Sequence, residues 1–250
     1  METTPVRKLS DTQLQTFADY DYVTDELFEG ILAAIAHDFP DGVFSFLDVG
    51  GGRGFFADRL LTHFPNARAT VLDNSELLLS MNAPDSRKTL LLASATDVAE
   101  HFHDRPFDIV FFNLSLHHFV AGSYAQTRAL QRYAMEQVLT VLAPNGRVVV
   151  TENLFDGMFA DNLPSFLVYT LTSSKVLAPI VKRFGANTAG CGVCFLSTEA
   201  WRREFRRLHL RELSFQAQLW RESTLLRRVC LRLLSVRSSS RSFFWLAPTA

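Results

Sequence analysis

The stretch Leu47-Asp48-Val49-Gly50-Gly51-Gly52-Arg53-Gly54 decides the fold class of this 250-residue chain. It ends the short apolar run 44–49, which is typical of a buried strand, and it precedes the run 55–65, whose apolar residues recur at helical spacing. Glycines at such a turn let a ligand approach the backbone, and the start of the helix offers unpaired N–H groups. The stretch therefore predicts a strand, a glycine-rich ligand-binding turn and a helix.

The same alternation continues along the chain. Apolar runs predict further strands at 69–73, 89–95, 107–115 and 147–153, and amphipathic runs predict helices at 24–38, 75–83, 97–103 and 127–142. Several of these strands are continuously apolar, which indicates a parallel sheet that is covered on both faces. We therefore expect a doubly wound, Rossmann-like α/β core.

The remaining segments predict how this core is completed. The core spans 44–154, preceded by an N-terminal helical lid segment at 1–43 and followed by a lid insertion of helices and loop at 155–197. Segment 198–250 contains a helix from 198, a strand from 210, a helical stripe at 225–234 that we expect to cover the sheet, and a final strand ending at Pro248. Two added strands would give a seven-stranded sheet.

Composition excludes several classes of protein. A chain that is 48% hydrophobic and 20% charged is too apolar for disorder. Three cysteines do not form a disulfide framework, and the polar N-terminus lacks the apolar run of a signal peptide. The most apolar stretch, 164–181, contains polar residues and falls short of the ~20 residues of a membrane span. These features predict a cytoplasmic protein without a transmembrane segment, and they leave its oligomeric state open.

The glycine stretch departs from two familiar nucleotide-binding motifs. The dinucleotide motif would need glycine at position 55, which is Phe55, and a Walker A loop would need Gly-Lys-Ser/Thr. Instead an acid leads the glycines, as Asp48-x-Gly50-x-Gly52-x-Gly54. A second acid, Asp73, ends the next strand, where a carboxylate can accept hydrogen bonds from the adjacent hydroxyls of a ribose.

With these acids, the strand exit 113–119 and the turn 142–147, the chain resembles the class I S-adenosylmethionine-dependent methyltransferases of the small-molecule type. The resemblance covers roughly residues 44–154, and it implies the fold of that class with S-adenosylmethionine as cofactor. Ser94-Ala95 replaces the usual acid and small residue after the third strand. The cofactor-binding residues implied by the resemblance are Asp48, Gly50, Gly52, Gly54, Asp73, Asn74, Ser94, Ala95 and Asn113.

His117 is the candidate catalytic base. Methyl transfer needs a base when the acceptor is a hydroxyl or a protonated nitrogen, and histidine titrates in the useful range. By position His117 resembles the catalytic histidine of small-molecule O-methyltransferases, although His118 and Phe119 follow it where those enzymes have Asp-Trp. The alternative is a histidine that only lines the pocket.

Aromatic residues suggest the acceptor. The chain lacks the Pro-Pro-Tyr/Phe sequence of enzymes that methylate nucleobase amino groups, which disfavours that reaction. A flat apolar or aromatic small molecule, methylated at oxygen or nitrogen, would suit the aromatic lid segments, which alternatively form a packed core. The sequence leaves open whether Tyr20 or Tyr22 closes over the cofactor. The predicted acceptor-binding residues are His118, Phe155, Phe159 and Tyr169.

Charge and cysteine patterns leave alternatives open. Residues 201–250 contain 11 arginines and carry a net charge of +8, against −9 for the rest of the chain. We favour a solvated face, or pairing with the acidic body, over recruitment of RNA, protein or a membrane surface. A non-catalytic cofactor-binding module is a third possibility. The lone Cys191-x-x-Cys194 pair predicts packing in a glycine-rich loop rather than a metal site.

Overall fold

A computed structural model describes residues 7, 9–15, 23–102, 106–220 and 224–249. The strands are β1 (Ser45–Val49), β2 (Arg68–Asp73), β3 (Lys88–Leu92), β4 (Phe107–Asn113), β5 (Leu142–Gly157), β6 (Leu210–Leu219) and β7 (Val236–Pro248). The helices are α1 (Asp11–Gln15), α2 (Asp25–Asp38), α3 (Phe55–His63), α4 (Glu76–Leu79), α5 (Val98–His101), α6 (Tyr124–Leu139), α7 (Leu163–Ser173), α8 (Ala178–Arg183), α9 (Thr198–Arg207) and α10 (Leu225–Leu233). Two short 3-10 helices are η1 (Ala95–Asp97) and η2 (Leu116–His118).

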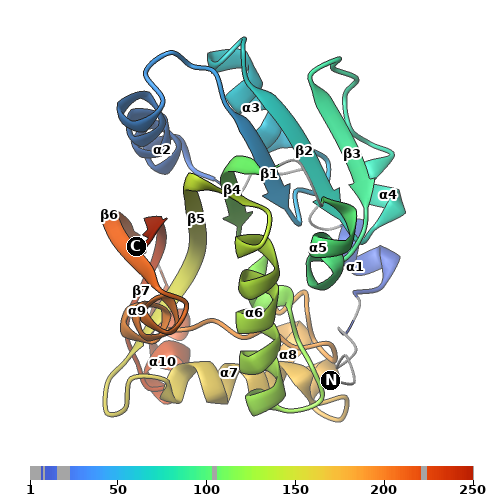
Figure 1. Ribbon diagram of the computed structural model, residues 1–250. Helices are drawn as coiled ribbons and strands as arrows, with labels where there is room; N and C mark the ends of the chain where they lie inside the picture. Colours follow the sequence, from blue (N-terminus) through green and yellow to red (C-terminus); the bar gives the residue numbers. More distant parts are fainter. Residues whose placement is uncertain (1–6, 8, 16–22, 103–105, 221–223, 250) are drawn as a thin grey trace.

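The described strands form one seven-stranded sheet in the order β3-β2-β1-β4-β5-β7-β6 (Figure 1). Strands β1 to β5 pair in parallel, whereas β7 is antiparallel to both β5 and β6. The carboxyl ends of the parallel strands therefore meet at one edge, and the chain order reverses beside β1. Ligands bind outside such an edge in open α/β sheets. The predicted doubly wound sheet is confirmed.

Both faces of the sheet are buried, as the continuous apolar strands predict. On one face, helices α2 and α3 pack on inward residues such as Phe46 and Phe111, whose rings meet edge to face at a centroid distance of 5.7 Å. On the other face, α6 and α9 pack on alternate residues such as Val110 and Phe244. The sheet is thus a rigid support whose carboxyl edge carries the loops.

The predicted boundaries of the third and fifth strands move. Residues 144–146, predicted as a turn before the fifth strand, lie inside β5, whose pairing with β4 shifts register between Phe107 and Ile109. Strand β5 also continues to Gly157 by pairing with β7, past the predicted strand end at residue 153. Strand β3 ends at Leu92 because Ser94 begins η1, its side chain accepting a hydrogen bond from the N–H of Thr96.

The predicted flanking segments are placed in part. Helix α2 buries Leu27, Phe28 and Ile31 against the sheet, so this part of the N-terminal segment belongs to the core. The stripe predicted to cover the sheet forms α10, which instead leaves Leu225 and Leu233 exposed. Tyr20 and Tyr22 lie outside the described residues. The division of the chain into lid and core segments stays a prediction.

Candidate active site

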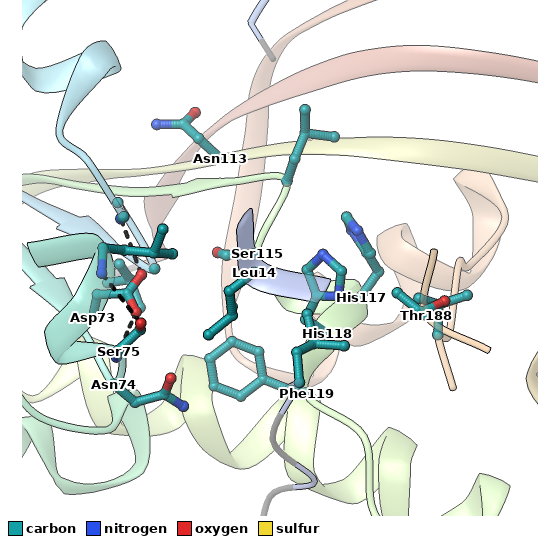
Figure 2. Close-up of a pocket in the computed structure, with 18 of the residues that line it drawn as sticks. Leu14, Asp73, Asn74, Ser75, Asn113, Ser115, His117, His118, Phe119 and Thr188 are labelled. Carbon is teal, nitrogen blue, oxygen red and sulfur yellow. Dashed lines mark hydrogen bonds between the residues drawn. The ribbon is translucent and has the colours of Figure 1, made fainter. Parts of the chain in front are cut away.

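A cavity of about 1060 Å³ lies at the carboxyl ends of β1, β2 and β4. Loop residues after α8, together with α7, form much of its other wall. In Figure 2, Asp73, Asn74 and Ser75 lie on one side, the two histidines lie near the centre, and Thr188 lies on the far side. The predicted residues that the structure brings together in this cavity are Asp48, Gly50, Gly52, Asp73, Asn74, Ser94, Ala95, Asn113, His117 and His118.

The glycine turn after β1 passes close to the exit of β4. Gly50 has a φ of +72°, in the left-handed region that favours glycine, and a Cβ added there would lie 2.7 Å from Cβ of Ser115. Any side chain would therefore force the turn away from its present position. Gly54 differs from the other predicted glycines, because it precedes α3 and does not line the cavity.

Asp73, at the end of β2, presents a buried carboxylate to the cavity. Its Oδ2 accepts a hydrogen bond from the N–H of Gly52 at 3.0 Å, and its Oδ1 accepts one from Ser75 at 2.8 Å (Figure 2). Burial raises the pKa of Asp73, against the lowering effect of these backbone hydrogen bonds. The carboxylate is thus fixed in direction while each oxygen keeps a lone pair for a ligand.

Asp48 and Asn113 form the floor between β1 and β4. Asn113 donates from Nδ2 to Oδ1 of Asp48 at 3.2 Å and accepts from the hydroxyl of Thr151 at 3.0 Å. These bonds fix the amide orientation of Asn113, so its direction is set by two neighbouring strands. Nearby, Ser94 and Ala95 line the cavity where the loop after β3 turns into η1.

His117 is held by a residue that the sequence motifs did not reveal. Glu152, buried on β5, places Oε2 at 2.7 Å from Nδ1 of His117, and its Oε1 accepts the backbone N–H of His117 at 3.1 Å. An ionised carboxylate only accepts, so it favours the tautomer of the neutral ring that has its proton on Nδ1 and leaves Nε2 as the acceptor. The sequence signal that could have found Glu152 was an acid near the end of the predicted strand 147–153, which lies beside the strand that leads to His117.

His118 lies beside it, with ring centroids 4.1 Å apart. Burial first, and the neighbouring His117 second, hold the pKa of His118 well below its usual value of 6.5. The protein therefore presents His118 as a neutral ring at physiological pH. It can accept or donate a hydrogen bond to a ligand without carrying charge.

The lowered pKa of His118 predicts a pH-dependent stability. The unfolded chain takes up a proton on this residue below about pH 6.5, whereas the folded chain does not, so acid favours unfolding. The free energy of unfolding should fall as the pH drops through this value, and His118→Asn should remove part of that fall. Urea titrations across a pH series measure it, with exposed His101→Asn as the control. An unchanged pH dependence in His118→Asn would contradict the assignment.

The predicted aromatic residues lie outside the cavity. Phe159 is 84% exposed, Phe155 packs on Phe195 and Trp220, and Tyr169 donates its hydroxyl proton to the carbonyl oxygen of Ala121. None of the three lines the cavity wall. Helical spacing places an aromatic residue on a helix face, but it does not say which face meets a ligand.

Residues that the sequence analysis did not single out also line the cavity. They include Arg7, Asn153 and Arg241, and Arg241 donates from Nε to Oδ1 of Asn153 at 3.1 Å. The rings of Phe119 and Phe195 add apolar surface. These residues come from five separate parts of the chain, so no local pattern in the sequence joined them.

Cys191 and Cys194 of the glycine-rich loop are free thiols, the first half-buried and the second buried. No cluster of potential metal ligands occurs among the described residues. Burial raises the pKa of the Cys194 thiol to about 11, so it stays protonated, and its sulfur lies 3.5 Å from the hydroxyl of Ser165. The packing role of this pair stays a prediction. No helix in the described part of the chain is long and apolar enough to cross a membrane.

Comparisons with known proteins agree with this geometry. Residues 47–150 match the family model described as a methyltransferase domain. No curated protein sequence matches the chain at a significant level.

Solved structures share the fold at low sequence identity. The MccD protein gives a TM-score of 0.64 at 13% identity, over 92% of this chain and 100% of that chain. The Haemonchus contortus phospholethanolamine N-methyltransferase 2, in complex with phosphomonomethylethanolamine and S-adenosylhomocysteine, gives a TM-score of 0.60 at 13% identity. The match covers 96% of this chain and 57% of that chain. The [4+2]-cyclase SpnF gives a TM-score of 0.60 at 15% identity, over 93% of this chain and 85% of that chain. At these identities the likeness shows the fold alone.

The sheet order with its antiparallel β7, and the family match over the glycine turn, β2 and β4, lead to the same assignment. The chain has the class I methyltransferase fold, and its residues 47–150 match a methyltransferase domain.

Proposed function

We propose that this protein transfers a methyl group from S-adenosylmethionine to an oxygen or nitrogen of a small molecule, with His117 taking the acceptor's proton. One observation carries the proposal. A single cavity has the glycine turn and Asp73 on one side and His117, which Glu152 holds from behind the cavity wall, on the other. A cofactor and an acceptor can therefore meet between them.

The residues on the first side fit the cofactor. The turn at Gly50 has no room for a side chain, and Asp73 offers a fixed carboxylate for two adjacent ribose hydroxyls. The hydroxyl of Ser115 lines the cavity, is buried and has no hydrogen-bond partner in the described parts of the chain. A polar group of the cofactor would satisfy it. Other predicted contacts are Asp48, Gly52, Asn74, Ser94, Ala95 and Asn113.

S-adenosylmethionine, when bound, supplies a methyl group that its sulfonium already activates for in-line displacement. The protein therefore has to orient the acceptor, exclude water and remove a proton. Nε2 of His117 is the group that takes this proton, and Glu152 stabilises the positive charge that the ring then gains. His118, kept neutral, would position the acceptor by a hydrogen bond.

The remaining side chains that line the cavity favour a small acceptor with both apolar and polar parts. Phe119 and Phe195 offer ring surfaces, while Arg7, Asn153 and Arg241 offer donors. Helix α7 and the loop after α8 cover this side, which limits entry of a large substrate. Ion pairs also satisfy part of the arginine-rich region, since Arg202 contacts Glu212 and Arg203 contacts Asp161. These features favour a small molecule over RNA or protein.

Methyl transfer is tested with methyl-labelled S-adenosylmethionine and a panel of small phenols, amines and carboxylic acids. We expect S-adenosylhomocysteine to form together with an acceptor whose mass has risen by one methyl group. Cofactor binding without transfer to any acceptor would favour the non-catalytic module, and structural likeness to SpnF, described as a [4+2]-cyclase, would then justify a search for product rearrangement.

A further inference from the structure

Exposed apolar side chains form two rows, one on and beside α8 in the lid insertion and one on α10. In the first row Ile180 and Phe184 are four residues apart on and just after α8, and Val176 precedes them by another four. In the second row the residues of α10 are also four apart, so they share one side of the helix. We call these six residues, which are 47% to 86% exposed, the lid face: Val176, Ile180, Phe184, Leu225, Val229 and Leu233.

Exposed cations flank both rows of the lid face. Segments 162–198 and 223–250 contain no Asp or Glu, and they carry net charges of +3 and +5. Arg228 and Arg232 form no ion pair with a carboxylate of the described residues, in contrast to the arginines of α9. The exposed cations beside the rows are Lys175, Lys182, Arg183, Arg227, Arg228 and Arg232.

Both rows lie at the same end of the molecule. Helices α7, α8 and α10 line the lower end in Figure 1, toward which β1 and β2 point. The same lid segment has its other side on the cavity, because Val168, Thr172 and Thr188 line the cavity wall. The row on and beside α8 therefore belongs to the segment that covers the candidate active site, and the row on α10 lies at the same end of the molecule.

We propose that the lid face docks on an anionic lipid bilayer. Its apolar side chains would enter the boundary between headgroups and acyl chains, and its cations would contact lipid phosphates. A second copy of the chain fits less well, because the cations of the two copies would face each other. Nucleic acid also fits less well, since Phe184 is the only aromatic residue of the lid face available for base stacking.

Vesicle co-sedimentation of the full chain tests this. We expect binding to vesicles of phosphatidylglycerol and phosphatidylcholine that weakens with salt, and much weaker binding to phosphatidylcholine alone. Each cation near an anionic surface contributes roughly a factor of five, so Arg228→Gln with Arg232→Gln should reduce affinity by about 25-fold. Leu225→Ser with Leu233→Ser should reduce it by at least about 30-fold, because both side chains lose their burial in lipid.

Matched controls lie toward the other end of the sheet. Arg68→Gln with Arg211→Gln removes two exposed cations, and Val43→Ser with Leu213→Ser removes two exposed apolar side chains. We expect these pairs to bind vesicles like the parent chain. Circular dichroism and the unfolding midpoint of every variant show that folding is retained, independently of cofactor binding and of methyl transfer.

Several results would overturn the docking proposal. They are equal affinity for charged and neutral vesicles, and lid-face variants that bind as well as their controls. A dimer that dissociates in the Leu225→Ser, Leu233→Ser variant would assign the lid face to a second copy. Salt-sensitive binding of an RNA oligonucleotide, with no vesicle binding, would assign it to nucleic acid. None of these results changes the proposed methyl transfer, which the acceptor panel tests separately.

Discussion

Asp73→Asn should weaken the binding of S-adenosylhomocysteine at least about 100-fold. The carboxylate of Asp73 is held by the N–H groups of Gly52 and Ser75, and it is placed to accept two ribose hydroxyls. Hydrogen bonds to a charged group contribute about 1.5–3 kcal/mol each, and the amide replaces one acceptor with a donor. Isothermal titration calorimetry measures the loss, and a urea titration checks the fold.

Asp41→Asn is the matched control for this change. Asp41 also accepts a backbone N–H, that of Val43, but it lies in the turn before β1 and outside the cavity. We expect its affinity for S-adenosylhomocysteine to equal that of the parent chain. Because burial raises the pKa of Asp73, acid should weaken cofactor binding by protonating this carboxylate, and the Asn variant should lack that dependence. Equal affinity in both variants would contradict the ribose assignment.

His117→Asn should reduce turnover by about 100- to 10,000-fold with the acceptor that the panel identifies. This is the range that a positioned general base contributes. The affinity for S-adenosylhomocysteine should stay close to that of the parent chain, because His117 lies across the cavity from Asp73 (Figure 2). Single-turnover kinetics separates this chemical step from binding.

Glu152→Gln tests the positioning role of the carboxylate. Glutamine would present an amide N–H to Nδ1, which places the ring proton on Nε2 and blocks proton uptake there. We expect turnover to fall roughly 100-fold or more, with little change in KM and an altered pH profile. His101→Asn, an exposed histidine at the end of α5, should retain full activity. If Glu152→Gln reduced cofactor affinity and turnover by the same factor, Glu152 would have a structural role only.

The sequence predicted most of the sheet because its physical signals are local. The apolar runs that form β1, β2 and β4 are buried on both faces, so their composition alone separates them from amphipathic helices. The end of β3 was misplaced because one serine side chain accepts a backbone N–H and starts η1. The length of β5 depends on its pairing with β7, which is about ninety residues away in the chain.

The candidate site could be predicted where residues share one turn or where they follow parallel strands that end at the same edge of the sheet. Asp48 and Gly50 share one turn, so their spacing is a local pattern. Glu152 meets His117 because β5 lies beside β4, and Arg241 reaches the cavity from β7. Such contacts depend on sheet order, which no spacing in the sequence states. The aromatic ring of Phe159 in a predicted lid segment suggests an acceptor contact, but this side chain is exposed to solvent.

The most direct test of the account is calorimetric titration of the unmodified protein with S-adenosylmethionine and S-adenosylhomocysteine, with NAD as the control. The glycine turn and Asp73 predict binding of the first two with a Kd in the micromolar range, and no binding of NAD. Absence of binding by either sulfur compound would mean that the turn after β1 only connects a strand to a helix. The proposed methyl transfer would then be contradicted.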